Sequence, residues 1–555
     1  MKYTFSYQNP HHHFITIDVE IDTVDKNEIN LQLPAWRPGR YELGNFAKNV
    51  RDFSVYSIEG KKLECNKVSI DKWNVKCENA DAISVQYLYY ASELNAGSTF
   101  LDDNQLYVNP VNCCIYDPED LSSKCTVEIN YPRAYKIATS LKNVGENLYE
   151  AKDFHELADS PFIVSDSLQH NSYTVEGVEF HLWFQGEVKP NWDKLISDFT
   201  KFTTYQINCF GGFPVDEFHF LFQITPYKYY HGVEHQKSTV ISLGPSYAVF
   251  EERYIDLLGV SSHELYHTWN VKAIRPNGLF PYDYNTENYT KSGYVTEGVT
   301  TYMGDLILLE SDVFSDKEYQ KELETIITRH FHNGGRNHYS VAESSFDTWL
   351  DGYEQGVPSR KTSIYVEGAL TAMVCDMRIR KATNGEKTLH SVMKTLYNQT
   401  NQEKGYSEKE YKQLFEDFGG ESFEDIFKDL IYGTNKFAPY IKEALRYRNL
   451  ELVISNSKNE AENYGLKLTP KHGTMIVLDV LENSAAYYSG ILRDDKIYAI
   501  NNYPLEGDLA QWLTYFKGQD ISLSLKREGA LITVNLQAKN GMRFFKYTLE
   551  QKKLS

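Results

Sequence analysis

The spacing of apolar residues changes twice along the chain, and this limits the fold more than any other feature. Over residues 1–170, stretches such as "HFITIDVEID" and "CTVEINYP" alternate apolar and polar side chains and are separated by turn residues. A period of two, with many β-branched and aromatic residues, is typical of strands with one buried face. We therefore predict an N-terminal domain over residues 1–170 that is an antiparallel β-sandwich.

A helical period replaces this alternation in residues 171–448. "GVEFHLWFQG" and "FHFLFQITP" still indicate strands, but "YAVFEERYIDLLGVSSHELYHTWNV" and "GYVTEGVTTYMGDLILLES" place apolar residues three to four apart. Further stretches with this period follow. They predict an α+β domain that continues into a helical lobe.

Strands return in residues 449–555, with a short helix in "VLENSAAYYSGILRDDKIYAINN". The segment has the length of a separate module. The whole chain is therefore predicted to be a multidomain α+β protein.

Charge excludes some classes of partner. The net charge is −19, whereas nucleic acids and anionic membrane surfaces are bound by basic patches. The longest apolar runs, such as "DLILL", are too short to span a bilayer, and "MKYTFSYQNPHHHF" lacks the pattern of a secretion signal. We expect no nucleic-acid or membrane partner and a cytoplasmic location.

The stretch "SSHELYHTWN" contains the clearest chemical motif. His263 and His267 are four residues apart in a predicted helix, so their imidazoles lie on one face and can converge on one ion. Glu264 points to a different side, where its carboxylate can act on water. This is the H-E-x-x-H pattern of zinc peptidases, although two histidines can also share a helix face by chance.

A catalytic zinc ion needs a third protein ligand and an open position. Glu297, in "GYVTEGVTTYMGD", is a candidate at the start of an otherwise apolar helix. A carboxylate near a helix N-terminus is also ordinary capping chemistry, so the residues alone leave both interpretations open.

Several motifs in the same order resemble those of the glycyl aminopeptidase family of zinc peptidases. These are "HELYHTWNVKAIRP", "EGVTTYMGD" and "SIYVEGALTAMVCDMRIR", with "AWRPGRYELGNF" and "DFHELADSPF" near the N-terminus. The resemblance implies a thermolysin-like catalytic domain of the gluzincin group. It also implies one zinc ion per chain, with His263, His267 and Glu297 as ligands and Glu264 as general base.

Two further stretches are similar to motifs of aminopeptidase N-like enzymes. "HGVEHQKS" contains Gly232 and Glu234 and resembles their G-x-M-E-N strand, which implies that Glu234 binds the free α-amino group of the substrate. "IYVEG" resembles their Y-x-K-G stretch, which implies that Tyr365 stabilises the oxyanion, with Glu367 in place of the lysine. A solvated glutamate and a structural tyrosine are the ordinary alternatives.

These observations together favour a zinc aminopeptidase that removes N-terminal residues from peptides. Family membership suggests small residues, Gly or Ala, at the cleaved position. The alternatives are a zinc endopeptidase of the same fold and a non-catalytic peptide-binding protein. Residues 449–555 resemble a PDZ domain, which would bind a peptide by strand addition or pack on the catalytic lobe.

Overall fold

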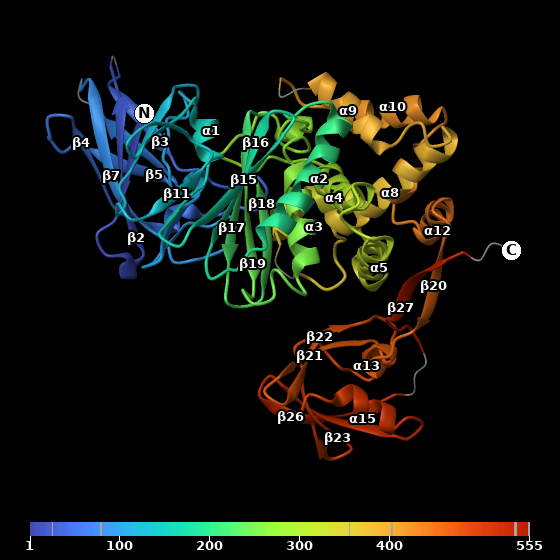
Figure 1. Cartoon of the computed structure of the whole chain (residues 1–555). Helices are drawn as coiled ribbons and strands as arrows, with labels where there is room; N and C mark the ends of the chain where they lie inside the picture. Colours follow the sequence, from blue (N-terminus) through green and yellow to red (C-terminus); the bar gives the residue numbers. More distant parts are fainter. Residues whose placement is uncertain (25, 78–79, 354–355, 401–402, 538–540, 553–555) are drawn as a thin grey trace.

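Sheets dominate the N-terminal region (Figure 1). The structure, a computed structural model, describes all residues except 25, 78–79, 354–355, 401–402, 538–540 and 553–555. A seven-stranded sheet has the order β12-β13-β10-β1-β2-β7-β4, and smaller sheets have the orders β11-β14-β9-β8 and β3-β6-β5. The elements are β1 (Lys2–Ser6), β2 (Phe14–Asp22), β3 (Glu28–Gln32), β4 (Val50–Ser57), β5 (Cys65–Ser69), β6 (Lys72–Lys76), β7 (Ala82–Tyr90), β8 (Phe100–Leu101), β9 (Gln105–Val108), β10 (Cys125–Ile129), β11 (Lys136–Thr139), β12 (Lys142–Gly145), β13 (Leu148–Ala151), α1 (Phe154–Ala158) and β14 (Phe162–Ser165).

The predicted period of two is confirmed in these strands. Burial alternates along β2 and β7, and each of the three sheets contributes buried side chains to one shared core. The prediction of a purely antiparallel arrangement is wrong at one pair, because β1 and β10 run parallel from Lys2↔Thr126 to Phe5↔Ile129. The long segment between these two strands provides the crossover that parallel neighbours require.

A five-stranded mixed sheet follows, with the order β15-β16-β17-β19-β18. Its strands are β15 (Gln169–Val175), β16 (Val178–Gln185), β17 (Glu217–Ile224), β18 (Tyr229–Glu234) and β19 (Ser238–Gly244). One face packs on the helices in the largest core of the molecule, and the other contacts the N-terminal region. Strand β18 lies at the edge of this sheet, beside α3 (Figure 1).

Helices make up most of the next two hundred residues. They are α2 (Trp192–Phe210), α3 (Tyr254–Tyr266), the π-helical turn η5 (Tyr294–Val299), α4 (Thr300–Glu310), α5 (Asp316–His332), α6 (Val341–Phe346), α7 (Thr348–Asp351), α8 (Ile364–Ala382), α9 (Leu389–Thr400), α10 (Glu408–Gly419), α11 (Glu424–Ile426) and α12 (Ala438–Tyr447). Capping boxes begin α5, α6 and α10, where a serine and a glutamate three residues later satisfy the free amides. The helical lobe predicted from the 3.6-residue period is confirmed.

The C-terminal segment forms a unit with its own core. Its elements are α13 (Glu460–Asn463), β21 (Leu466–Lys471), β22 (Thr474–Val480), α14 (Ala485–Tyr488), β23 (Lys496–Ile500), β24 (Tyr503–Pro504), α15 (Leu509–Tyr515), β25 (Ile521–Arg527) and β26 (Ala530–Leu536). A ribbon of β20 (Leu450–Asn456) and β27 (Phe545–Gln551) links it to the helical lobe (Figure 1). Apolar side chains of this ribbon belong to the core of the helical lobe. No helix in the described part of the chain is both long enough and apolar enough to cross a bilayer.

Candidate active site

The two histidines lie at the C-terminal end of α3, with their Nε2 atoms 3.0 Å apart. The Nδ1–H of His267 donates to the carbonyl oxygen of Asn270 at 2.7 Å, which leaves a lone pair on Nε2 of the neutral ring. Helix α4 approaches this helix closely at Gly304, where a Cβ would lie 3.2 Å from the Cα of His263. The close approach keeps α3 beside the segment that carries Glu297.

Glu297 faces both histidines. Its Oε2 is 3.9 Å from Nε2 of His263 and 3.5 Å from Nε2 of His267. Two imidazole nitrogens and one carboxylate are a known ligand set of catalytic zinc sites, so these three residues fit a zinc ion. The turn η5, which carries Glu297, packs on α8 through Gly298 and Gly368: a Cβ on Gly298 would be only 2.3 Å from the Cα of Gly368.

The Glu264 carboxylate lies against β18 at Gly232, and one of its oxygens is within 4.8 Å of a ring nitrogen of His267. It is buried, and its Oε2 has no hydrogen-bond partner among the described residues. Burial raises the pKa of Glu264, against the opposing influence of His267. A carboxylate with raised proton affinity that faces a cleft is suited to general-base work.

Strand β18 forms one wall of the same cleft. Tyr230, Gly232 and Glu234 alternate along it and line the cleft together. Gly232 lets the strand lie against Glu264, because a Cβ there would be 2.1 Å from Oε1 of Glu264. Glu234 is only 4% exposed, and within the described part of the chain its Oε1 has no partner. A buried carboxylate oxygen without a donor is costly, so Glu234 is placed to receive a cation.

The N-terminal region also contributes to the site, which the sequence patterns did not predict. Gly39 (φ +82°) lies against Glu234, and a Cβ on it would be 2.3 Å from Oε2 of Glu234. The Tyr41 side chain interacts with the Glu297 carboxylate. "AWRPGRYELGNF" was noticed only as a resemblance, because nothing local indicates that this loop reaches the zinc ligands.

Tyr365 lies at the start of α8 and in the wall of the cleft. Burial raises the pKa of Tyr365 well above its usual value, so the phenol stays protonated and can donate. It interacts with Tyr353, which the sequence did not indicate. Glu367, in the lysine position of the related motif, instead contacts Nδ1 of the buried His330 at 2.7 and 2.8 Å.

A buried network supports the turn that follows Glu234. Asp159 Oδ1 lies 2.8 Å from Nζ of Lys272 and 3.1 Å from Nδ1 of His235, and Oδ2 accepts from the backbone N–H of Gln236 at 2.8 Å. Burial disfavours the ionised carboxyl, but Lys272 and His235 outweigh it and hold the pKa of Asp159 well below its usual range. Asp159 of the N-terminal region therefore holds the β18–β19 turn in place through His235 and Gln236.

A second group of possible metal ligands lies on β16 and β17. His181, Glu217 and His219 present nitrogen and oxygen atoms within 4.8 Å of one another. The indole N–H of Trp183 donates to Nδ1 of His219 at 3.2 Å, so the neutral His219 ring carries its proton on Nε2, the atom nearer Glu217. A protonated nitrogen is no metal ligand, and this arrangement fits an ordinary histidine–carboxylate contact.

The cleft at the histidines has a volume of about 380 Å³ and brings together every residue that the sequence nominated. They are Gly232, Glu234, His263, Glu264, His267, Glu297 and Tyr365. The arrangement combines a metal-ligand set, a base, a phenol donor and a buried carboxylate, that of Glu234, whose Oε1 has no hydrogen-bond partner among the described residues.

Family models and solved structures relate this chain to peptidases. The Peptidase M61 N-terminal domain matches residues 2–166, and the M61 glycyl aminopeptidase model matches residues 256–371. An aminopeptidase N family protein from Idiomarina loihiensis has a similar fold, with a TM-score of 0.93 at 24% identity over 100% of this chain and 98% of that chain. A mutant M1 zinc metallopeptidase from Deinococcus radiodurans, bound to a Tyr-Ser-Ala substrate, has a TM-score of 0.51 at 13% identity, over 78% of this chain and 94% of that one. No curated protein sequence matches this chain. The two family models match in order and flank the mixed sheet that carries Glu234, and the chain belongs to the M61 glycyl aminopeptidase family.

Proposed function

We propose that this protein is a zinc-dependent aminopeptidase that hydrolyses the first peptide bond of substrates with a free N-terminus. His263, His267 and Glu297 would hold one zinc ion per chain. When bound, the ion supplies a Lewis acid that polarises the scissile carbonyl and makes water more acidic. Family membership favours Gly or Ala as the residue removed.

The side chains of the cleft take separate roles. Glu264 accepts the proton of the attacking water on its carboxylate and passes it to the departing amine. The Tyr365 hydroxyl donates a hydrogen bond to the carbonyl oxygen as negative charge develops there. Glu234 pairs with the α-ammonium group of the substrate through a charge-assisted bond.

The buried, unpaired oxygen of Glu234 is the observation that carries the exopeptidase proposal. An endopeptidase would place a neutral peptide against this wall, and the carboxylate would remain without a partner, at a cost. An ammonium group satisfies it. A strand edge beside the metal ligands also suits an extended peptide, because β18 pairs with β19 on its other side.

Glu234→Ala tests this proposal against the endopeptidase alternative. We expect kcat/KM for unblocked glycyl and alanyl peptides to fall by about tenfold or more, since a charge-assisted bond is lost. N-acetylated peptides should be poor substrates of both forms. Equal cleavage of blocked and unblocked peptides by the unaltered protein would favour an endopeptidase. No cleavage of either, with or without added zinc, would favour a peptide-binding protein.

For residues 449–555 we propose a PDZ-like module with a structural role. The backbone N–H groups of Tyr464 and Gly465, at the position expected for carboxylate capture, donate to the carbonyls of Ala461 and Glu462. Because these N–H groups already donate within the protein, they are not free to bind the carboxylate of a peptide C-terminus. The β20–β27 ribbon, which packs on the helical lobe, supports an intramolecular role.

A further inference from the structure

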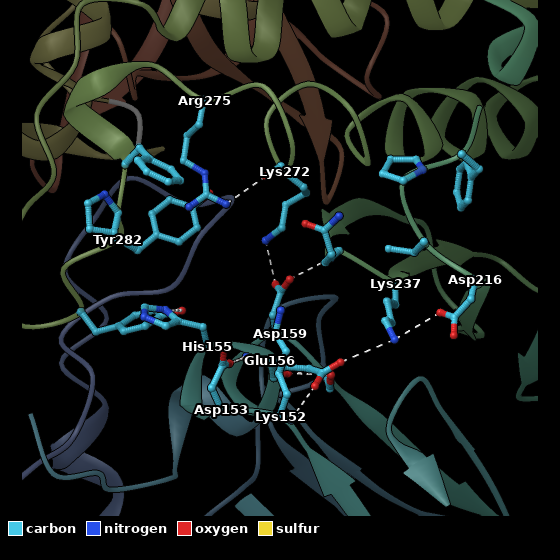
Figure 2. A pocket seen from close by; sticks show the side chains of 18 residues that line it. Lys152, Asp153, His155, Glu156, Asp159, Asp216, Lys237, Lys272, Arg275 and Tyr282 are labelled. Atoms are coloured by element: carbon cyan, nitrogen blue, oxygen red, sulfur yellow. Dashed lines mark hydrogen bonds and ion pairs between the residues drawn. The ribbon is translucent and has the colours of Figure 1, made fainter. Parts of the chain in front are cut away.

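A second cavity, of about 530 Å³, lies where the N-terminal region meets the catalytic region. Helix α1 and its flanks contribute one side, and the segments 213–216, 236–237 and 272–284 contribute the others. It shares no lining residue with the cleft at the histidines. Its volume is within the range of small-molecule sites. Figure 2 shows Arg275, His155 and Tyr282 on one side of it and Lys237 and Asp216 on the other.

The carboxylates of this cavity are all engaged by the protein. Asp159 has the three partners described above. Glu156 accepts from the backbone N–H of Lys152 at 2.6 Å, and Asp153 accepts from the backbone N–H of Glu156 at 2.7 Å. Asp216 pairs with Lys237 at 3.3 Å. Each acidic side chain of the cavity therefore already has a partner within the protein.

Two donors of the lining, in contrast, lack an acidic partner among the described residues. Arg275 donates to the carbonyls of Val271 and Lys272 and stacks on the Tyr282 ring at 3.8 Å, but it has no carboxylate within ion-pair distance among the described residues. The Nε2 of Gln236 is buried without a hydrogen-bond partner in the same part of the chain. A buried amide donor with no acceptor is costly, and an oxygen ligand would satisfy it.

The charge and the apolar side chains of the lining indicate which kind of anion the cavity can bind. Four basic and four acidic side chains give the cavity a balanced formal charge, which disfavours a dianion such as phosphate. Aromatic and proline side chains form its apolar surface, namely Phe213, Pro214, Phe280, Pro281, Tyr282 and Tyr284. An arginine fork beside an apolar wall suits a carboxylate joined to an apolar body.

We propose that this cavity is a second binding site, for a small organic carboxylate with an apolar or aromatic body. Arg275 binds the carboxylate, the Gln236 amide donates to it, and the body packs between Phe213 and Tyr282. The site lies behind the β18–β19 turn and takes its ligand independently of the histidine cleft.

The test is titration calorimetry on the zinc-loaded full chain with N-acetyl-L-phenylalanine, compared with its uncharged amide. The blocked amine prevents binding through Glu234. We expect saturable binding of the acid and affinity about tenfold or more weaker for the amide, because a charge-assisted contact is lost. N-acetyl-Gly-Gly-Phe shows whether a peptide C-terminus is accepted as well as a free small acid.

Variants locate the binding. Arg275→Gln should lower the affinity for N-acetyl-L-phenylalanine by a similar factor. Gln236→Ala provides a second variant if the first folds poorly. Arg448→Gln is the matched control, because Arg448 is also half-buried and lies over a tyrosine ring, that of Tyr319, at 4.9 Å. Absence of saturable binding, equal binding of acid and amide, or wild-type affinity in both cavity variants would overturn the proposal.

Discussion

Replacing Asp159 by Asn should displace Glu234, the proposed anchor of the substrate's α-ammonium group. The substitution changes no residue that lines the cleft. The side chain accepts from Lys272, His235 and the backbone N–H of Gln236. Asn keeps the shape but offers one acceptor oxygen and no charge. Lys272, whose side chain is 2% exposed, would then be a buried cation without its anion.

The substitution should lower both the stability of the protein and the affinity of Glu234 for the substrate. Leaving one partner of a buried pair unpaired costs about 3–5 kcal/mol of stability. Glu234 precedes His235 directly, so loosening the turn displaces the carboxylate, and a loss of about 1.4 kcal/mol in anchoring is tenfold in kcat/KM. The folded-state pKa of Asp159 is depressed. Its contribution to stability is therefore complete above the unfolded pKa of about 3.9 and is lost only as pH falls below it.

Asp376→Asn is the matched control. Asp376 is buried and, like Asp159, has three partners: the Tyr302 hydroxyl at 2.8 Å, Nε of Arg380 at 2.9 Å and the Leu389 N–H at 2.7 Å. Both variants should lower the denaturant midpoint at neutral pH. Asp159→Asn alone should raise KM for free-amine peptides and speed amide exchange in residues 235–238.

Two outcomes would contradict a specific link between Asp159 and Glu234. If exchange in the turn stays at the wild-type rate, Asp159 does not hold it. If both variants change KM for unblocked peptides equally, the effect is one of general stability and the network has no specific link to the anchor.

Three further outcomes follow from the cleft. Glu264→Gln should still bind zinc, as metal analysis would show. Its kcat should fall by about 10²–10⁴, the usual contribution of a general base. Near-normal turnover with zinc bound would exclude that role. Gly232→Ala should lower kcat up to about 10²-fold in a steady-state assay, because its Cβ would lie 2.1 Å from Oε1 of Glu264 and displace it. Tyr365→Phe should lower kcat by about 10²–10³ with little change in KM; a change in KM alone would indicate a binding role instead.

Local geometry explains what could be predicted from the sequence. The period of two and the 3.6-residue period predicted sheets and helices because side-chain direction repeats within each element. The same rule placed His263 and His267 on one face of a helix. Each of these relations depends on the spacing of a few neighbouring residues, so it can be predicted from the sequence.

Relations between distant segments depended on packing. The parallel pairing of β1 with β10 is set by chain crossing, and the contact of Glu297 with the histidines needs α4 to lie on α3 at Gly304. The place of Glu297 in the ligand set came only from family resemblance, since a helix-capping glutamate has the same local pattern.

The chemical groups that this protein carries can be read from its sequence, whereas which of them meet depends on the tertiary packing. Tyr41 reaches Glu297, and Asp159 holds the turn beyond Glu234, although no local pattern indicates that their N-terminal region contributes to the site. Glu367 pairs with the buried His330, which lies 37 residues earlier in the chain. Arg275 and the cavity beside it have no local signature, because a cavity exists only between segments that folding brings together.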